Sequence, residues 1–313
     1  MLSFVLRRFL AGVSLAFVVV TGIFFFLILT GTDPARGSLG AYATVAQVEA
    51  KHHELGLDRS VFVQYLDWLG KALTGNLGTS SAQNVGVSDL ILSRLPVTVS
   101  LAIGAVLVAA VLGVLLGVLA AVRPGRIDRV LQIVMVLGFA LPNFWVALIL
   151  AQFFAVKLRW FPATGYTPFL ESPIGWVASI TLPIIALAIG SIAAIAQQLR
   201  NSVITVYEQD YVRTLRSRGL PSRNILLIHV LRNASPPALT MLSLQFIAAL
   251  SGAAIVELVF GLQGIGSVAI AASGSGDIQV IMGMMLFTVL VVVSVNFVVD
   301  VLYGALNPKV RMS

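Results

Sequence analysis

The sequence contains no cysteine and very little charge, and both shortages restrict what the protein can be. Of its 313 residues, 11% are charged and 58% are hydrophobic, whereas a soluble globular protein carries about 25% charged residues. The absence of cysteine excludes disulfide frameworks, thiolate metal sites and cysteine nucleophiles. With a mean hydropathy of +0.98, this chain does not have water as its main solvent.

The residue patterns of common catalytic sites are missing as well. A Walker A loop ends in Gly-Lys followed by Ser or Thr, but the single Gly-Lys of the chain, Gly70-Lys71, is followed by Ala72. His52 and His53 are neighbours on a polar stretch, which predicts solvated side chains rather than a metal site. No Ser/His/Asp arrangement or pair of carboxylates stands out. We therefore expect no catalytic residue, no metal and no cofactor on this chain.

The apolar residues that are present fall into six separate blocks, each near the length of a membrane-spanning helix. About 20 helical residues cross a hydrocarbon layer roughly 30 Å thick. Pro142 lies within the third block and is expected to bend that helix. The sequence thus predicts an all-α, polytopic protein embedded in the lipid bilayer. Its six predicted transmembrane helices cover residues 9–30, 97–122, 129–157, 176–199, 236–258 and 279–304.

The distribution of positive charge predicts the orientation. Thirteen of the 20 Lys and Arg residues lie near the two termini, at 123–129 and at 200–232, and the other side keeps seven of them with most of the acids. The positive-inside rule then places the N and C termini in the cytoplasm. The first apolar block is longer than the 7–15 residues of a signal-peptide core, so we expect a retained span. No basic run alternates with exposed aromatics, so no nucleic acid is expected as a partner.

Two connections between the spans are too long to be turns. After the first transmembrane helix, at residues 1–30, an extracytoplasmic structure is predicted over residues 31–96. It contains an amphipathic stretch, Val61–Leu69, with aromatic and acidic side chains that we expect to be exposed. The remaining 97–313 form the predicted transmembrane domain, which includes an inner segment at 200–237.

The inner segment divides into two short helical pieces. Gly219 suits a helix C-terminus and Ser222 suits an N-cap. Acids at the start of the first piece and arginines toward its end fit the helix dipole. Charge alone would favour a solvated loop, but a passive turn needs only a few residues. The length therefore favours a projecting helix that docks with a partner protein.

This inner segment resembles the cytoplasmic coupling loop of ABC importer permeases, in the version found in dipeptide and oligopeptide permeases. The general pattern is Glu-Ala-Ala, three residues, then Gly. Here Arg213-Thr214-Leu215 precedes Gly219, where the peptide subfamily usually has Arg-Thr-Ala, so Leu215 is the unusual residue. Arg232-Asn233-Ala234 is similar to the Leu-Arg-Asn-Ala that follows in that group.

The resemblance extends over nearly the whole chain. Gly75–Ser80 is similar to part of the first outer loop of the B-type subunit, with Asn76 in place of the usual Asp. Val256–Gly266 resembles Val-Glu-x-x-Phe-x-x-Pro-Gly-x-Gly, with Gln263 in place of the usual Pro. The N-terminal span and the C-terminus also follow the family. Each motif is weak by itself, and their shared order identifies the chain as a member of the permease family.

The resemblance implies a type I ABC importer permease fold and the role of a pore subunit for short peptides. The implied partners are a second homologous permease subunit, two cytoplasmic ATPase subunits that would bind ATP and Mg, an extracytoplasmic peptide-binding protein and the peptide substrate. A nickel complex, glutathione or haem is the alternative cargo for the same architecture. A secondary transporter or channel without ATPases is the alternative from another class.

Two sets of site residues follow from these expectations. In the extracytoplasmic half, Glu257 is expected either to tie down the glycine-rich turn after it or to contact substrate. The expected ATPase-coupling residues are Asp210, Tyr211, Arg213, Thr214, Leu215, Arg216 and Gly219. The expected binding-protein or outer-gate residues are Tyr65, Trp68, Glu257, Gly264 and Gly266.

Overall fold

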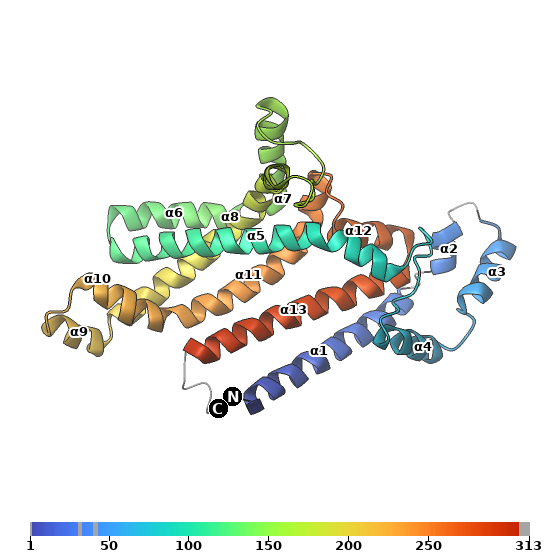
Figure 1. Ribbon diagram of the computed structural model, residues 1–313, viewed down its shortest axis with the longest axis horizontal. Coiled ribbons are helices and arrows are strands. Elements are labelled where there is room, and N and C mark those ends of the chain that lie inside the picture. The colour runs from blue at the N-terminus through green and yellow to red at the C-terminus, as the bar shows by residue number, and fades with distance from the viewer. Residues whose placement is uncertain (1, 31–32, 40–42, 307–313) are drawn as a thin grey trace. The chain divides into compact units, whose positions relative to one another are not determined.

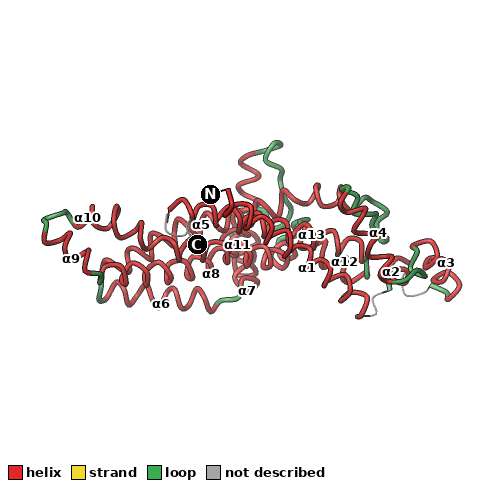
Figure 2. The backbone as a smooth tube through the Cα atoms, turned by 90° about the horizontal axis from the view of Figure 1, so that it is seen from below, coloured by secondary structure: helices red, strands yellow, loops and turns green. Residues whose placement is uncertain are grey.

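A computed structural model describes residues 2–30, 33–39 and 43–306 of the chain (Figure 1). Helices dominate, and the described residues contain no strand, only an isolated bridge between Thr79 and Gly86 (Figure 2). The predicted all-α class is therefore confirmed. The chain forms two compact units: a central unit, Thr98–Leu262 with the part from Val295 onward, and a flanking unit, Leu2–Val97 with Gln263–Ser294.

The described residues hold five helices that are long and apolar enough to cross a membrane, or six if a bent pair of helices is counted as one span. The bent pair joins α6 (Arg126–Ala140) to α7 (Asn143–Leu150) and the π-helical turn η1 (Ala151–Lys157). The five long helices are α1 (Leu2–Leu29), α5 (Val87–Val122), α8 (Pro173–Tyr207), the stretch Ser222–Val259 and α13 (Ile278–Leu306). Within Ser222–Val259 lie α10 (Ser222–Asn224), the π-helical turn η2 (Ile225–Val230) and α11 (Leu231–Val259).

The third predicted span is broken rather than continuous. Leu141 leaves the helical region (φ −81°, ψ 121°), and Pro142 is the N-cap of α7. A proline disfavours the helical conformation of the residue before it, so α6 ends at Ala140. The two halves meet at 95°. The predicted bend at Pro142 is confirmed, but the expectation of one helix over 129–157 is wrong.

Two of the spans continue well beyond their apolar blocks. The helix α5 begins ten residues before the predicted start at 97, and α8 ends at Tyr207 rather than at 199. At 1.5 Å per residue, the 35 residues of α8 extend over roughly 50 Å. Because about 30 Å crosses the hydrocarbon layer, the last turns of α8 project beyond the membrane and carry the inner segment.

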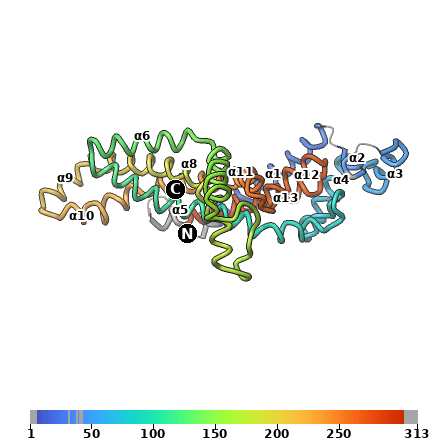
Figure 3. The backbone as a smooth tube through the Cα atoms, turned by 90° about the horizontal axis from the view of Figure 1, so that it is seen from above, coloured from blue at the N-terminus to red at the C-terminus, as the bar shows by residue number. Residues whose placement is uncertain are grey.

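In the central unit, α8 packs against α6 and α11 (Figure 3), and small residues bring α5 close to it. A Cβ atom added to Gly117 would lie 2.6 Å from the carbonyl oxygen of Ala196, and one added to Gly113 would lie 2.8 Å from the Ile195 side chain. Side chains larger than hydrogen do not fit at these positions. The Gly113/Gly117 spacing therefore permits close contact between α5 and α8.

In the flanking unit, α4 (Val61–Leu73) packs on α1 and α13 through a small apolar cluster of Val20, Phe24, Tyr65 and Met282. Two further short helices, α2 (Pro34–Leu39) and α3 (Val45–Leu55), precede α4 in the connection between α1 and α5. The cluster fixes α4 to the membrane helices rather than leaving it as a free loop.

A second cluster of the flanking unit joins the first turns of α5 to α13 and to α12 (Ile265–Ser275). The buried carboxylate of Asp277 caps the N-terminus of α13: its Oδ1 accepts a hydrogen bond from the amide of Val280 at 3.3 Å. Its Oδ2 accepts from Ser80 Oγ at 2.7 Å. One acidic side chain thereby caps a helix and fixes the loop before α5.

Candidate functional site

The predicted docking helix exists as α9 (Asp210–Ser217), and with α10 it forms one end of the central unit (Figures 1 and 2). Gln209 takes an extended conformation (φ −73°, ψ 147°), which separates α9 from α8. Asp210 lies in the first turn and Arg216 in the last, so both charges oppose the partial charges of the helix ends. The local sequence thus accounts for both the start of α9 and the placement of its charges.

Gly219 ends α9 as predicted. It adopts φ +79°, in the left-handed region that glycine enters without steric cost. The amide of Gly219 donates to the carbonyl of Arg216 at 2.9 Å, and the amide of Leu220 donates to that of Leu215 at 3.3 Å. This pair of bonds is the Schellman motif. The next N-cap is Pro221 rather than the predicted Ser222, which is the first residue of α10.

One face of α9 is packed into the protein. Val212 is fully buried, and it belongs to an apolar cluster with residues from the ends of α8, η2 and α11. Tyr211 and Leu215 pack at the edge of this cluster. The other members include Val203, Val206, Ile225, Val230 and Ala234. Any displacement of α9 therefore acts directly on the helices before and after it.

The opposite face of α9 is polar and exposed. The side chains of Asp210 and Arg213 are 95% and 73% exposed and lie 3.4 Å apart, a contact that water screens. Thr214 and Ser217 are also exposed, and their hydroxyls donate to carbonyls of the same helix. The predicted coupling residues thus divide into a packed set, Tyr211 and Leu215, and an outward set that is free to meet a partner.

A hydrogen bond that the sequence did not predict connects α9 to α11. Asn233 Nδ2 donates to Tyr211 Oη and to the carbonyl of His229, both at 2.9 Å. The buried anchor Val212 was also missed. The signal that could have shown it is the pair Val212 and Leu215, three residues apart in an otherwise polar stretch.

An ion pair connects α6 to α8 just before the inner segment. Arg200 donates from Nε and Nη2 to the two carboxylate oxygens of Asp128, at 2.6 and 2.7 Å. Both side chains are only 16% exposed. Bidentate geometry of this kind is the strong form of a salt bridge, so the start of α6 is fixed to the projecting end of α8.

Near the other end of α11, Glu257 is completely buried and accepts a hydrogen bond from Thr98 Oγ1 at 2.6 Å. The carbonyl of Glu257 also accepts from the amide of Leu262 at 2.8 Å. Gly261 takes φ +59°, and the carbonyl of Phe260 accepts from the amide of Gly165. The side chain of Glu257 therefore contacts α5 and its backbone carbonyl contacts the turn that follows, while the two roles expected for Glu257 stay predictions.

Gly264 and Gly266 belong to the flanking unit and not to a glycine-rich turn. Gly264 is the N-cap of α12, and Gly266 lies in the first turn of that helix. The small residues that follow Gly264 form a helix of eleven residues, and the outer-gate role expected for both glycines stays a prediction. Only Gly261 has the positive φ that a tight turn uses.

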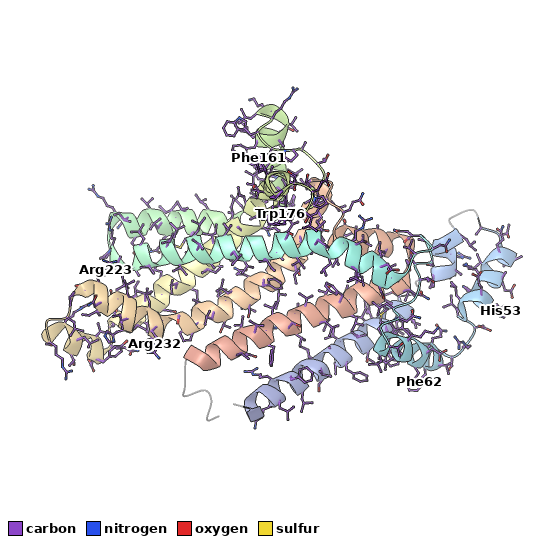
Figure 4. All side chains as sticks on the ribbon, viewed as in Figure 1. His53, Phe62, Phe161, Trp176, Arg223 and Arg232 are labelled. Carbon is purple, nitrogen blue, oxygen red and sulfur yellow. The ribbon has the colours of Figure 1, made fainter. Side chains whose placement is uncertain are left out.

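Tyr65 and Trp68 lie on α4, and the expectation that Tyr65 is exposed is wrong. Its side chain is 4% exposed, and its hydroxyl lies 2.6 Å from Thr21 Oγ1 of α1. The rings of Phe24 and Phe25 lie 5.2 and 5.6 Å from that of Tyr65. Trp68 is half-buried and lines a cavity of about 450 Å³ in the flanking unit. The exposed aromatic of α4 is instead Phe62, labelled in Figure 4.

Polar pairs hold the helices α2, α3 and α4 in the connection between α1 and α5. His52 Nε2 lies 2.9 Å from Asp33 Oδ1, and His53 Nδ1 lies 3.1 Å from Asp58 Oδ2. Burial by itself raises the pKa of the Asp33 carboxyl, but hydrogen bonds from His52 and from two backbone amides outweigh it and lower that pKa. The carboxylate form of Asp33 is therefore favoured beside α3.

Comparison with known families agrees with this arrangement. Residues 113–312 match the family described as binding-protein-dependent transport system inner membrane component. Residues 1–102 match the N-terminal region described for the same kind of membrane component. Together the two matches cover almost the whole chain, including α9 and the helices α2, α3 and α4.

Individual relatives are similar over their full length. A Brucella abortus (strain 2308) protein named as a peptide transport system permease is 36% identical over 312 residues, which cover 99% of each chain. The di/tripeptide transport system permease protein DppB of Pseudomonas aeruginosa (strain UCBPP-PA14) is 35% identical, also over 99% of each chain.

Among solved structures, an inward-facing form of the MetNI methionine ABC transporter shares the fold. The TM-score is 0.58 at 18% identity, and the match covers 70% of this chain and 96% of the other. The predicted importer-permease fold is thereby confirmed. With its apolar helices, the chain is a multi-pass inner-membrane protein, and it belongs to the family of binding-protein-dependent transport system inner membrane components.

Proposed function

We propose that this chain is one permease subunit of an ATP-driven importer that moves short peptides into the cytoplasm. The observation that carries the proposal is the two-sided construction of α9. Val212 is buried among the ends of α8, η2 and α11, while Asp210 and Arg213 are exposed on the opposite face. The names of the relatives, which match over 99% of their length, support peptides as the cargo.

In this proposal, two cytoplasmic ATPase subunits bind ATP and Mg, and one of them receives the exposed face of α9. Closure of the ATPases would move α9, and the apolar cluster would pass that movement to α8 and α11. A second homologous permease subunit completes the pore. The predicted placement of both termini and of α9 in the cytoplasm is part of the same proposal.

The test is reconstitution of the chain in proteoliposomes with its second permease, the two ATPases and the binding protein. We expect ATP-dependent uptake of di- or tripeptides, and none with ATPases that cannot hydrolyse ATP. Uptake of a nickel chelate, glutathione or haem in place of every peptide would overturn the proposed cargo. Peptide uptake by the permease pair without ATPases would overturn the coupling and assign a secondary transporter.

The extracytoplasmic helices are proposed to engage the peptide-binding protein, and the proposed contact is made by Phe62 and Leu66 of α4 because Tyr65 is buried. Phe62 and Leu66 are exposed, one helical turn apart, whereas Tyr65 lies in the cluster with α1. An apolar surface of this kind suits a protein partner. Substitution can therefore alter the contact surface without disturbing the packing of α4.

The double variant Phe62→Ser/Leu66→Ser tests this contact. We expect weaker binding of the binding protein to the reconstituted complex and slower uptake, with an unchanged thermal midpoint. The matched control is Leu73→Ser, which changes another exposed leucine at the end of α4. Equal affinity in the double variant and the wild type would show that α4 does not contact the binding protein.

A further inference from the structure

A basin of about 690 Å³ lies in the central unit beside the docking helix. Its wall is formed by the end of α5, the turn and first residues of α6, the last turns of α8, and parts of α9 and α10. Three arginines line it: Arg200, Arg216 and Arg223. The basin adjoins the apolar cluster of the proposed lever, because Tyr207, Ile225 and Leu226 belong to both.

The charges of the basin are not balanced. Arg200 is neutralised by Asp128 in the bidentate pair. Arg216 lies over the ring of Tyr207, with its guanidinium carbon 5.4 Å from the ring centre, and forms no ion pair among the described residues. Arg223 has no ion pair within the described part of the chain either. Glu208 is the one other carboxylate in the lining, so two guanidinium groups face one acid.

The lengths of the spans indicate that the basin lies near the level of the lipid headgroups. Its inner wall contains Ala120 and Val122, at the end of the α5 span, and Asp128, in the first turn of the α6 span. Counting about 20 residues of α8 as hydrocarbon-spanning, Arg200 lies just past the apolar part of that helix. Arg216 lies on α9, which follows the last turns of α8, and Arg223 is the second residue of the stretch Ser222–Val259.

Exposed apolar surface continues from the basin along the spans on both sides. On α6, Ile127 and Val130 are exposed, and on η2, Leu227 and Ile228 are exposed. Such strips accommodate acyl chains, while a basic pocket at the ends of transmembrane helices suits an anionic head group. Both halves of a phospholipid therefore find matching surface at one place.

We propose that this basin binds a phosphate ester, the head group of an anionic phospholipid, between Arg216 and Arg223. Arginine offers planar, multiple donors to phosphate oxygens. The residual carboxylate of Glu208 and the pair Arg200–Asp128 bound the site and limit it to one such group. A lipid held there would contact α9 at Arg216 and so would touch the same helix that the ATPase is proposed to receive.

The experiment is native mass spectrometry of the full chain in detergent, titrated with phosphatidylglycerol or with zwitterionic phosphatidylethanolamine. We expect tighter binding of phosphatidylglycerol to the wild type. Each basic group near such a surface contributes about fivefold, so Arg223→Gln should weaken the binding about fivefold and Arg216→Gln/Arg223→Gln about 25-fold. The matched control is Arg232→Gln on α11, an exposed arginine outside the basin (Figure 4), which should leave the affinity unchanged.

Glycerol phosphate distinguishes the two sources of this chemistry. Failure of millimolar glycerol phosphate to displace phosphatidylglycerol supports a lipid site, and displacement supports a site for a soluble phosphate ester. The proposal is overturned if Arg216→Gln/Arg223→Gln binds phosphatidylglycerol as the wild type does. It is equally overturned if Arg232→Gln lowers the affinity as much as Arg223→Gln, because the preference would then reflect general basic charge.

Discussion

The two long connections between the spans are built by opposite means. The inner one, around α9, is held by apolar packing, with Val212 fully buried among the ends of three helical segments. In the other connection, between α1 and α5, the helices α2 and α3 are held mainly by polar pairs, such as His52 with Asp33 and His53 with Asp58. Only one residue of α3, Val48, is buried.

Because of this difference, the two segments should respond differently to displacement, salt and pH. Apolar packing is dense and insensitive to salt, so it transmits displacement. Exposed ion pairs contribute between zero and about 1 kcal/mol and weaken with salt and pH. We therefore expect the inner segment to move together with the spans. We expect α2 and α3 to change position more easily when a partner binds.

The largest expected effect comes from breaking the inner packing with Val212→Asp. A carboxylate buried without a partner costs at least about 3 kcal/mol, so we expect α9 to detach and peptide uptake to fall at least tenfold. ATPase activity in the reconstituted complex should persist but lose its stimulation by peptide. Retained uptake in this variant would contradict the lever.

The outer counterpart of that change is Arg59→Gln, which breaks the exposed pair with Asp67 on α4. We expect at most about 1 kcal/mol of destabilisation, measured as a small shift of the thermal midpoint. Should Val212→Asp prevent insertion, Val212→Ala provides the same comparison, with about 2 kcal/mol expected. Equal losses in the two segments would remove the distinction between them.

A smaller effect is expected from a matched pair of glycines. At both Gly219 and Gly70 a Cβ atom would meet only open space, but Gly219 has φ +79° and Gly70 lies inside α4. Gly219→Val should destabilise α9 by roughly 1–2 kcal/mol through backbone strain alone, and Gly219→Asn should recover part of it. Gly70→Ala should be neutral or slightly stabilising. Peptide-stimulated ATPase activity and thermal midpoints measure both, and an unaffected Gly219→Val would show that the left-handed residue has no part in coupling.

The smallest effect concerns pH. The pKa of Asp33 in the folded protein lies below its ordinary value of 3.8, so its stabilising contribution is complete above that value and is lost as the pH falls through the lowered pKa. We expect amide exchange in α2 and α3, corrected for intrinsic rates, to accelerate below about pH 3.8. Asp33→Asn should remove this pH dependence. Amide exchange in α9 should not change with the protonation of Asp33. Identical profiles for Asp33→Asn and the wild type would exclude the carboxyl as the cause.

The membrane spans could be predicted because each depends on local composition alone. An apolar block of about 20 residues is sufficient evidence for a helix in lipid, and Pro142 fixes where the third one breaks. The extensions of α5 and α8 could not be predicted, because their polar ends are held by tertiary contacts such as that of Arg200 with Asp128. The helix α12 was missed because its small and glycine residues have weak helix propensity, which packing overrides.

The residues of the candidate site could likewise be predicted only where local sequence determines their conformation. The end of α9 requires a left-handed backbone conformation, which favours glycine, so the position of Gly219 at this helix end follows from residue type. Tyr65 does not, because the contact that buries it lies on α1, 44 positions away. Gln263 and Asn76 depart from the family pattern, and each has a partner in the structure. The guanidinium of Arg94 donates to Gln263, and Asn76 Oδ1 accepts from the amide of Gly78 at 3.0 Å.

The contact of Gly117 with Ala196 has a mechanical consequence. Where two helices meet through side chains, a small displacement of one is absorbed by changes of rotamer. Here backbone lies against backbone, so there is no soft layer between α5 and α8. Because the two backbones are in direct contact, we expect a displacement of the end of α8 to move α5 with it.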